Sequence, residues 1–328
     1  MNRSVRIGMW HVRYRWLWVT LCFGAVAINP AGQAQSAPPL RHTRLHVLAS
    51  RSLAAGLNVA DVQAAGTVWL QVIGRRRGFQ LDSRFEVVES LEVIRKQLEE
   101  FSADLVILDP IEYLKLAPLG LLQPFVAIAR GKNGTLQNDL LVVNRASGSS
   151  DVADLRGKNI LSCSRSETDM GRIWIETLLN EEHLERAEHF FGSITHVLKP
   201  SSACLPVFFG KLDACIVNNA GWEVLTEMNP QLSSKLRIIA TSPPFLEGLL
   251  CIHVKHKDFR EELLQSLLDL HRDPEGKQLL MVFKGERVLP VSERDIDTSR
   301  ELWRKYAMVA AVPNHLGKSD GAQTSGRP

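Results

Sequence analysis

The sequence predicts an α/β protein with two lobes, mostly parallel sheets and a cleft between the lobes. Short apolar runs alternate with helical patterns along most of the 328 residues. The run ADLVILD (103–109) is almost continuously apolar, which is typical of a strand buried on both faces. After Asn144 the alternation starts again. We therefore assign residues 142–241 to one lobe and residues 41–141 plus 242–312 to the other.

The elements of the first lobe follow from apolar spacing. A helix is expected over 59–74, where Val62, Ala65, Leu70 and Ile73 recur at helical intervals. Further helices are expected over 91–101, over 111–121 as a short helix and turn, over 259–273 and in a helical C-terminal part that ends near 310. The expected strands are 45–50, 85–90, 103–109, 125–131 and 138–145.

The second lobe repeats the strand–helix alternation. Its expected strands are 159–164, 212–218 and 236–242, with a strand-like piece within 185–199. Its expected helices are 168–179, 201–211 and 220–229, and Pro206 predicts a late start or a kink in the second of these. The chain would cross between the lobes twice, as in proteins that bend at a hinge and bind a ligand in the cleft.

The N-terminal 34 residues have the pattern of a secretory signal peptide. Arginines precede the apolar run 17–28, and Gly32 and Ala34 suggest cleavage after Ala34. The apolar run is shorter than the roughly 20 residues that span a bilayer, although an uncleaved anchor stays open as an alternative. The mature protein is therefore expected to be exported and soluble, and the polar residues 313–328 are expected to form a disordered tail.

Composition and motifs exclude several classes of function. The net charge is only +3 and the basic residues are scattered, so we expect no nucleic-acid partner. Metal and cofactor motifs are missing from the sequence, so we expect neither a metal nor a cofactor. Four cysteines remain after cleavage, namely Cys163, Cys204, Cys215 and Cys251. They are either buried thiols or disulfide partners, and the sequence does not choose among the three possible pairings.

The run LSCSRSETDMGRIWIETLL (161–179) is the most informative segment, and two interpretations stay open. A strand followed by hydroxyl residues and a helix exposes backbone N–H groups that favour an anion, with Ser164, Ser166 and Thr168 as additional donors. Alternatively, Ser164 and Glu167 form a capping box that satisfies those N–H groups. A catalytic nucleophile is not expected, because no GxSxG elbow is present.

Other candidate ligand-binding residues lie at strand ends, where open α/β sheets bind ligands. Tyr113 follows the buried strand 103–109, and its alternative role is packing at a helix start. Asn218 either contacts the ligand or caps the following helix. The remaining candidates are Ser50 and Arg51 in the first lobe and the cationic side chains His196 and Lys199 in the second.

Several runs resemble the phosphate/phosphite/phosphonate-type periplasmic substrate-binding proteins of ABC transporters, which have the type II periplasmic binding fold. The similar runs are 103–114, 151–171, 206–217 and 236–245, and the similarity extends over about residues 45–305. A VFFGK-x-DAC-like run followed by an NPQL-like run resembles a divergent subgroup of that family. Where the family usually has Ser-Thr-Ser-Gly, this chain has Ser164-Arg165-Ser166-Glu167.

The resemblance implies a periplasmic, monomeric solute-binding protein. It would hold a small, phosphorus-containing or other oxyanion solute between its lobes and deliver it to an inner-membrane ABC permease. One alternative is the same fold acting as a ligand sensor for a membrane signalling protein. Another is an exported hydrolase or transferase, which a Ser–His pair at bonding distance would favour.

Overall fold

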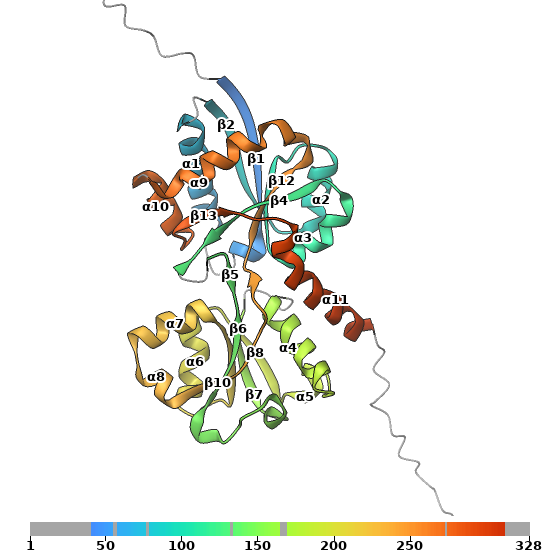
Figure 1. The fold of residues 1–328 in the computed structure, drawn as a ribbon, viewed down its shortest axis with the longest axis vertical. Coiled ribbons are helices and arrows are strands. Elements are labelled where there is room, and N and C mark those ends of the chain that lie inside the picture. Colours follow the sequence, from blue (N-terminus) through green and yellow to red (C-terminus); the bar gives the residue numbers. More distant parts are fainter. Residues whose placement is uncertain are drawn as a thin grey trace, which may run out of the picture. The chain divides into compact units, whose positions relative to one another are not determined.

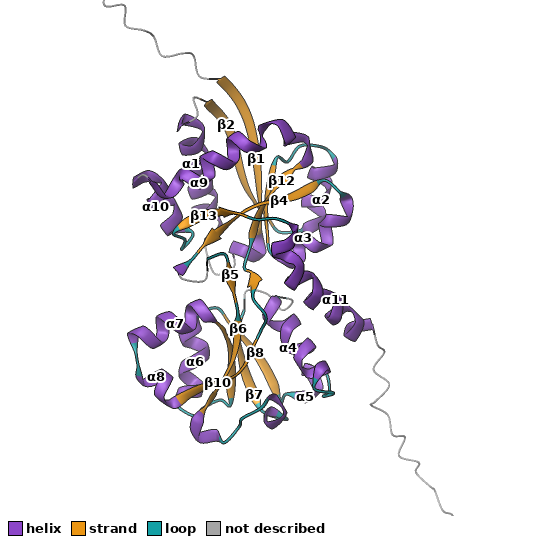
Figure 2. Ribbon diagram, viewed as in Figure 1, coloured by secondary structure: helices purple, strands orange, loops and turns teal. Residues whose placement is uncertain are grey.

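The described chain forms two large sheets with helices on both faces of each, as Figure 2 shows by colour, and a third sheet of two short strands. The computed structural model describes residues 41–54, 58–76, 79–131, 134–164, 169–272 and 274–311. The predicted signal peptide and the predicted tail lie outside these ranges. Within the described ranges, none of the helices is long and apolar enough to cross a membrane.

The first sheet has six strands in the order β13-β4-β12-β3-β1-β2. Figure 1 shows that it joins segments from both ends of the described chain. Its strands are β1 (Arg41–Ser50), β2 (Phe79–Val88), β3 (Leu105–Leu108), β4 (Leu122–Ala129), β12 (Leu249–His253) and β13 (Arg287–Pro290). The apolar run of β3 was predicted to be a buried strand, and β3 does lie between β1 and β12 inside the sheet.

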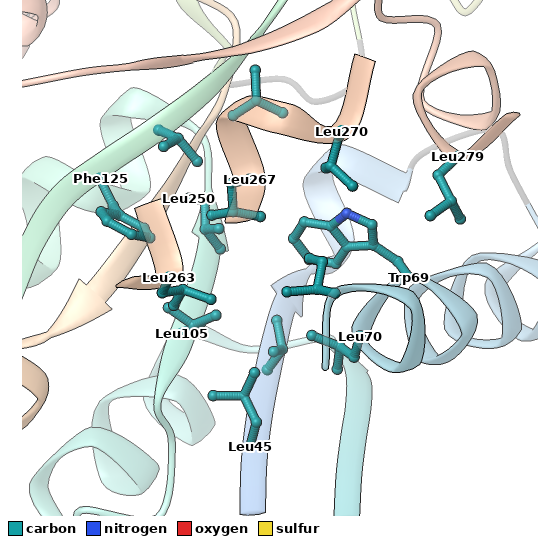
Figure 3. Packing of buried hydrophobic residues seen from close by; sticks show 14 of the residues in the cluster. Leu45, Trp69, Leu70, Leu105, Phe125, Leu250, Leu263, Leu267, Leu270 and Leu279 are labelled. Atoms are coloured by element: carbon teal, nitrogen blue, oxygen red, sulfur yellow. The ribbon is translucent and has the colours of Figure 1, made fainter. Parts of the chain in front are cut away.

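Helices from both parts of the chain cover this sheet. They are α1 (Val59–Arg76), α2 (Leu91–Glu99), α3 (Pro110–Leu116), α9 (Arg260–Leu268) and α10 (Pro274–Val282). On one face, α1, α9 and α10 pack a core around Trp69, which Figure 3 shows among leucines of the strands and helices. On the opposite face, α2 and α3 bury Ile94, Leu98 and Tyr113 against the strands.

The second sheet has five strands in the order β10-β6-β9-β7-β8. They are β6 (Asp139–Asn144), β7 (Asn159–Cys163), β8 (Ser193–Val197), β9 (Ala214–Asn218) and β10 (Leu236–Thr241). Its helices are α4 (Met170–Glu181), α5 (Ala187–Phe190), α6 (Pro200–Phe208), α7 (Asn219–Met228) and α8 (Gln231–Lys235). Two apolar clusters fill its faces, one under α4 and α5 and the other under α6 and α8.

The chain passes from the first sheet to the second and back through a pair of short strands. These are β5 (Leu136–Gln137) and β11 (Phe245–Leu246), which pair antiparallel. Residues next to these strands are tied together as well, because the side chain of Asn138, after β5, donates to the carbonyl of Ser242, before β11, at 2.7 Å. The C-terminal helix α11 (Asp297–Ala311) contacts both α3 and α4. The lobe boundaries proposed from the sequence stay a prediction.

The α/β prediction is confirmed, with corrections to strand pairing. The sheets are mixed rather than mostly parallel, because β12 and β6, the strands next to the two crossings, pair antiparallel with their neighbours. Parallel pairs join β1 to β2 and β3, and β7 to β8 and β9. The edge strand β13, which has four residues and ends in a proline, was not predicted, because so short a run has little periodicity.

Candidate functional site

Ser164 and His196 lie together at the carboxyl ends of two parallel strands. β7 pairs with β8 in a register that places Ser162 opposite His196, and Ser164 follows the end of β7. The Ser164 backbone N–H donates to the Val197 carbonyl at 3.1 Å, which extends the pairing by one residue. The Ser164 Oγ is 2.5 Å from His196 Nδ1. Parallel pairing therefore brings together two residues that are 32 positions apart.

The two partners differ in exposure. Ser164 is buried, with 5% of its surface exposed. His196 is exposed on the edge strand β8. Within the described ranges, the hydrogen bond found for its ring is the one at Nδ1. Both residues were predicted as ligand contacts, but only the strand register shows that they touch.

Helix α4 begins just after this pair, and its N-cap is Asp169. The Asp169 carboxylate accepts the Arg172 N–H at 3.1 Å. The N-cap of α4 is Asp169, and the Ser164 hydroxyl faces His196, whereas the capping box of Ser164 with Glu167 stays a prediction. Glu167, Ser166 and Thr168 lie outside the described residues.

The basic residue of the first helical turn is already paired. Arg172 Nη2 lies 2.8 Å from the carboxylate of Glu176, which is buried one turn further along α4. A second oxygen of Glu176 accepts the Ala187 N–H at 3.1 Å. Arg172 therefore neutralises a buried carboxylate within its own helix.

A buried aspartate, Asp139, lies against the start of α4. It is the first residue of β6, and a methyl group at position 171 would lie only 2.9 Å from its Oδ2. Gly171 therefore lets the helix approach this carboxyl closely. Burial raises the pKa of Asp139 to about 8, and the nearby Asp169 carboxylate adds to the effect. Asp139 is thus mostly protonated at neutral pH. Asp139 was not among the predicted site residues, because a charged residue beginning an apolar strand has no distinctive motif.

Lys199 and Asn218 are the N-cap residues of two further helices on this sheet, α6 and α7. Asn218 is the N-cap of α7, where its side-chain oxygen accepts the Gly221 N–H at 2.8 Å, and its amide donates to Gln137 at 3.2 Å. The capping interpretation of Asn218 is therefore realised. Lys199 precedes α6 without a side-chain cap bond, and it is exposed.

In the first sheet, Ser50 and Arg51 are engaged with neighbouring groups. Ser50 is buried at the end of β1 and donates to the Glu112 carboxylate. Arg51 donates to the Ala54 carbonyl at 2.8 Å and lies 3.4 Å from a Glu89 oxygen.

Tyr113 belongs to the apolar core on one face of the six-stranded sheet. Only 1% of its surface is exposed, and its hydroxyl donates to Glu293. Burial, together with that carboxylate, raises the pKa of the tyrosine. Asp109 and Glu112 form a capping box at the start of α3. The packing role weighed for Tyr113 is therefore present, and the two acids cap the helix that carries it.

The comparisons with known proteins identify the family. A family model for the periplasmic substrate-binding proteins of ABC phosphonate transporters matches residues 58–296, which is most of the chain. The chain belongs to this family. Its members are binding proteins of transporters rather than enzymes. Although Ser164 and His196 meet the distance criterion for the hydrolase alternative, this periplasmic substrate-binding protein is therefore not assigned catalysis.

Solved structures support the same fold for this substrate-binding protein. XAC2383 from Xanthomonas citri, bound to ATP, is 16% identical, with 81% of this chain and 98% of that chain covered and a TM-score of 0.60. PhnD1 from Prochlorococcus marinus, in complex with methylphosphonate, is 19% identical, with coverages of 80% and 98% and a TM-score of 0.56. A binding protein component of an ABC phosphonate transporter from Pseudomonas aeruginosa is 12% identical, with coverages of 81% and 87% and a TM-score of 0.55. The type II periplasmic binding fold expected from the resemblance is thus confirmed.

Proposed function

We propose that this protein binds a small oxyanion, of the phosphonate or phosphate type, at Ser164 and His196 and delivers it to an inner-membrane ABC permease. The observation that carries the proposal is the 2.5 Å contact between the Ser164 hydroxyl and His196 Nδ1 at the carboxyl ends of parallel strands. Ligands of open α/β sheets bind at such strand ends. The solute would lie between the two lobes.

The Ser164–His196 pair offers a hydrogen-bond donor to an anion in either tautomer. If the serine donates to Nδ1, the Nε2–H of the neutral histidine points outward as a donor. If Nδ1–H donates to the serine, the hydroxyl proton is free to bond the anion. A protonated histidine offers both donors and a positive charge, and hydrogen bonds to charged groups are the stronger ones.

Two acidic residues, Asp139 and Asp169, lie at the start of α4, but they oppose an anion less than two free carboxylates would. Asp139 is mostly neutral at pH 7, because burial raises its pKa to about 8. Asp169 is occupied in capping α4. The N-terminal end of that helix favours negative charge.

The ligands of the similar proteins support this chemical class. ATP, bound by XAC2383, and methylphosphonate, bound by PhnD1, both present phosphoryl oxygens. Lys199 and Asn218 are proposed as further contacts from the same sheet, and Ser166 and Thr168 stay predicted donors. Ser50, Arg51 and Tyr113 stay predicted contacts from the first lobe. Tyr113 would have to release Glu293 to reach a ligand.

The test is a ligand-induced thermal shift with phosphate, phosphite, methylphosphonate and an alkyl sulfonate, followed by calorimetric titration of the best ligand. Ser164→Ala and His196→Gln should each weaken binding about 10- to 100-fold, because each removes a bond to a charged group. Ser233→Ala in the exposed start of α8 and His189→Gln are matched controls and should bind normally. Unchanged affinity in both site variants, with the parent binding tightly, would remove this pair from the site.

We also propose that the protein is exported by cleavage after Ala34 and acts as a monomer. Mass measurement of the protein recovered from the periplasm of an expressing bacterium should give a chain beginning at Gln35. Recovery of the uncleaved chain in the membrane fraction would favour the sensor alternative instead.

A further inference from the structure

Three of the cysteines gather under one face of the five-stranded sheet. Cys163 ends β7, Cys204 lies in α6 and Cys215 lies in β9, and all three belong to one apolar cluster. Cys251 lies in β12 of the other sheet, in a different cluster. The fold therefore removes Cys251 from the possible pairings that the sequence left open.

Cys204 and Cys215 are the pair in direct contact. Both are fully buried thiols, and the Cys215 Sγ–H donates to Cys204 Sγ at 3.8 Å. A disulfide needs about 2.05 Å between the sulfurs, so side-chain rotation and a small movement of α6 must close the remaining gap. Such movement is eased by Pro206, which lies within α6 and has no N–H to donate to the preceding turn.

Cys163 is less well placed to bond Cys215. In the parallel pairing of β7 with β9, Leu161 is opposite Cys215, so Cys163 lies two residues further along and only diagonally across. Diagonal neighbours on adjacent strands lie about 7–8 Å apart, with a somewhat smaller Cβ separation, whereas a disulfide needs a Cβ separation of roughly 4 Å.

We propose that Cys204 and Cys215 form a disulfide when the protein folds in an oxidising compartment, while Cys163 and Cys251 stay thiols. Each of the two thiols gives up one proton and one electron, and the Sγ–Sγ bond forms. A small-molecule or protein disulfide takes up the two electrons and two protons, and its own S–S bond breaks to give two thiols.

The bond would form during folding rather than afterwards. In the folded protein, the contact with Cys204 and burial raise the pKa of Cys215 well above its usual value, so little of the reactive thiolate is present. Once formed, the disulfide would staple α6 to β9, in the sheet that carries Ser164 and His196.

The decisive measurement is a disulfide map of the full chain. The reduced, denatured chain is refolded with glutathione disulfide, blocked with N-ethylmaleimide and digested with trypsin. Cleavage after Lys211 separates Cys204 (peptide 187–211) from Cys215 (peptide 212–235), and every other cysteine falls in a peptide of its own. We expect peptides 187–211 and 212–235 to be joined, and the peptides with Cys163 and Cys251 to carry the maleimide.

Variants and thermal melting complete the test. Refolding with the disulfide should raise the melting temperature by about 5–10 °C over refolding in reductant, as a short closed loop allows. Cys204→Ala should abolish both the link and the shift, while Cys163→Ala should keep both. Maleimide on all four of these cysteines, or a link from Cys163 to Cys215, would overturn the proposal. If Cys204→Ala does not fold, the peptide map of the parent chain decides by itself.

Discussion

Asp139 and Asp104 are both buried aspartates, and their surroundings move their pKa values in opposite directions. Burial raises the pKa of Asp139 to about 8, and Asp169 contributes in the same direction. Burial also acts to raise the pKa of Asp104, but hydrogen bonds from His256 and Lys255 outweigh it and hold the value at about 2. The partners available to a carboxyl, rather than its depth, decide whether it is charged.

Asp139→Asn should stabilise the protein at alkaline pH. Because the folded-state pKa exceeds the ordinary value of 3.8, the parent loses stability as the pH rises from about 4 to about 8. The amide does not titrate, so the variant should be more stable by at least about 2 kcal/mol at pH 9 and similar at pH 4. Urea unfolding across this pH range measures the difference. A constant difference at all pH values would contradict the assignment.

Asp104→Asn should have the opposite pH profile. The folded-state pKa of about 2 lies below the ordinary value, so the ionised carboxylate stabilises the parent above about pH 4. That stability is lost as the pH falls toward 2. We expect the variant to be less stable by about 1 kcal/mol at pH 7, after allowance for solvent screening, and the difference to vanish near pH 2. Urea unfolding at both pH values checks this, and Asp82→Asn at an exposed ion pair is the control.

At the scale of elements, Asp169 at the start of α4 is both a helix cap and a negative charge. Asp169 caps the helix by accepting the Arg172 N–H, and it places a negative charge at the start of the helix that follows Ser164 in the sequence. Helix N-caps accept Asn as readily as Asp, whereas Ala costs about 1 kcal/mol. The two roles of Asp169 are therefore separable by substitution.

Asp169→Asn should keep the stability of the parent and bind the oxyanion several-fold more tightly, because a like charge is removed while the cap remains. Asp169→Ala should lower the free energy of unfolding by about 1 kcal/mol. Thermal melting and calorimetric titration of the two variants provide the comparison. Weaker binding by the Asn variant would indicate that the solute carries a cationic group near this carboxylate.

At the scale of the whole molecule, α11 links the helices that cover the two sheets. Leu302 of α11 is buried with Ile111 of α3, Ile173 of α4 and Phe245 of β11. Lys305, one turn further along, lies 2.6 Å from Glu181 at the end of α4. The C-terminal helix therefore packs against elements that lie far from it in the sequence.

Leu302→Ala should destabilise the protein by about 2–4 kcal/mol, because it leaves a cavity in this small cluster. Met308→Ala is the matched control on the same helix, since Met308 is 57% exposed, and it should change stability by less than about 0.5 kcal/mol. The midpoint of urea unfolding distinguishes the two. Equal effects of the two substitutions would mean that α11 does not contribute through its packed face.

Much of the fold could be predicted because its signals are local. The near-continuous apolar run of β3 marked a strand buried inside a sheet. The edge strand β13 could not be found, because it pairs with β4 from more than 150 positions away and has only four residues. Ser164 and His196 were each predicted as site residues. Neither their contact nor the role of Asp139 was predicted.

The sequence by itself determined the α/β class, the two-part alternation of strands and helices, and the family of periplasmic substrate-binding proteins, since apolar periodicity and short motifs are properties of neighbouring residues. The tertiary structure alone decided which distant groups meet. Parallel pairing of β7 with β8 places His196 against Ser164, and burial leaves Asp139 mostly uncharged beside α4. Packing of α6 on β9 brings Cys204 to Cys215. Register and burial depend on the whole chain, so local sequence does not specify them.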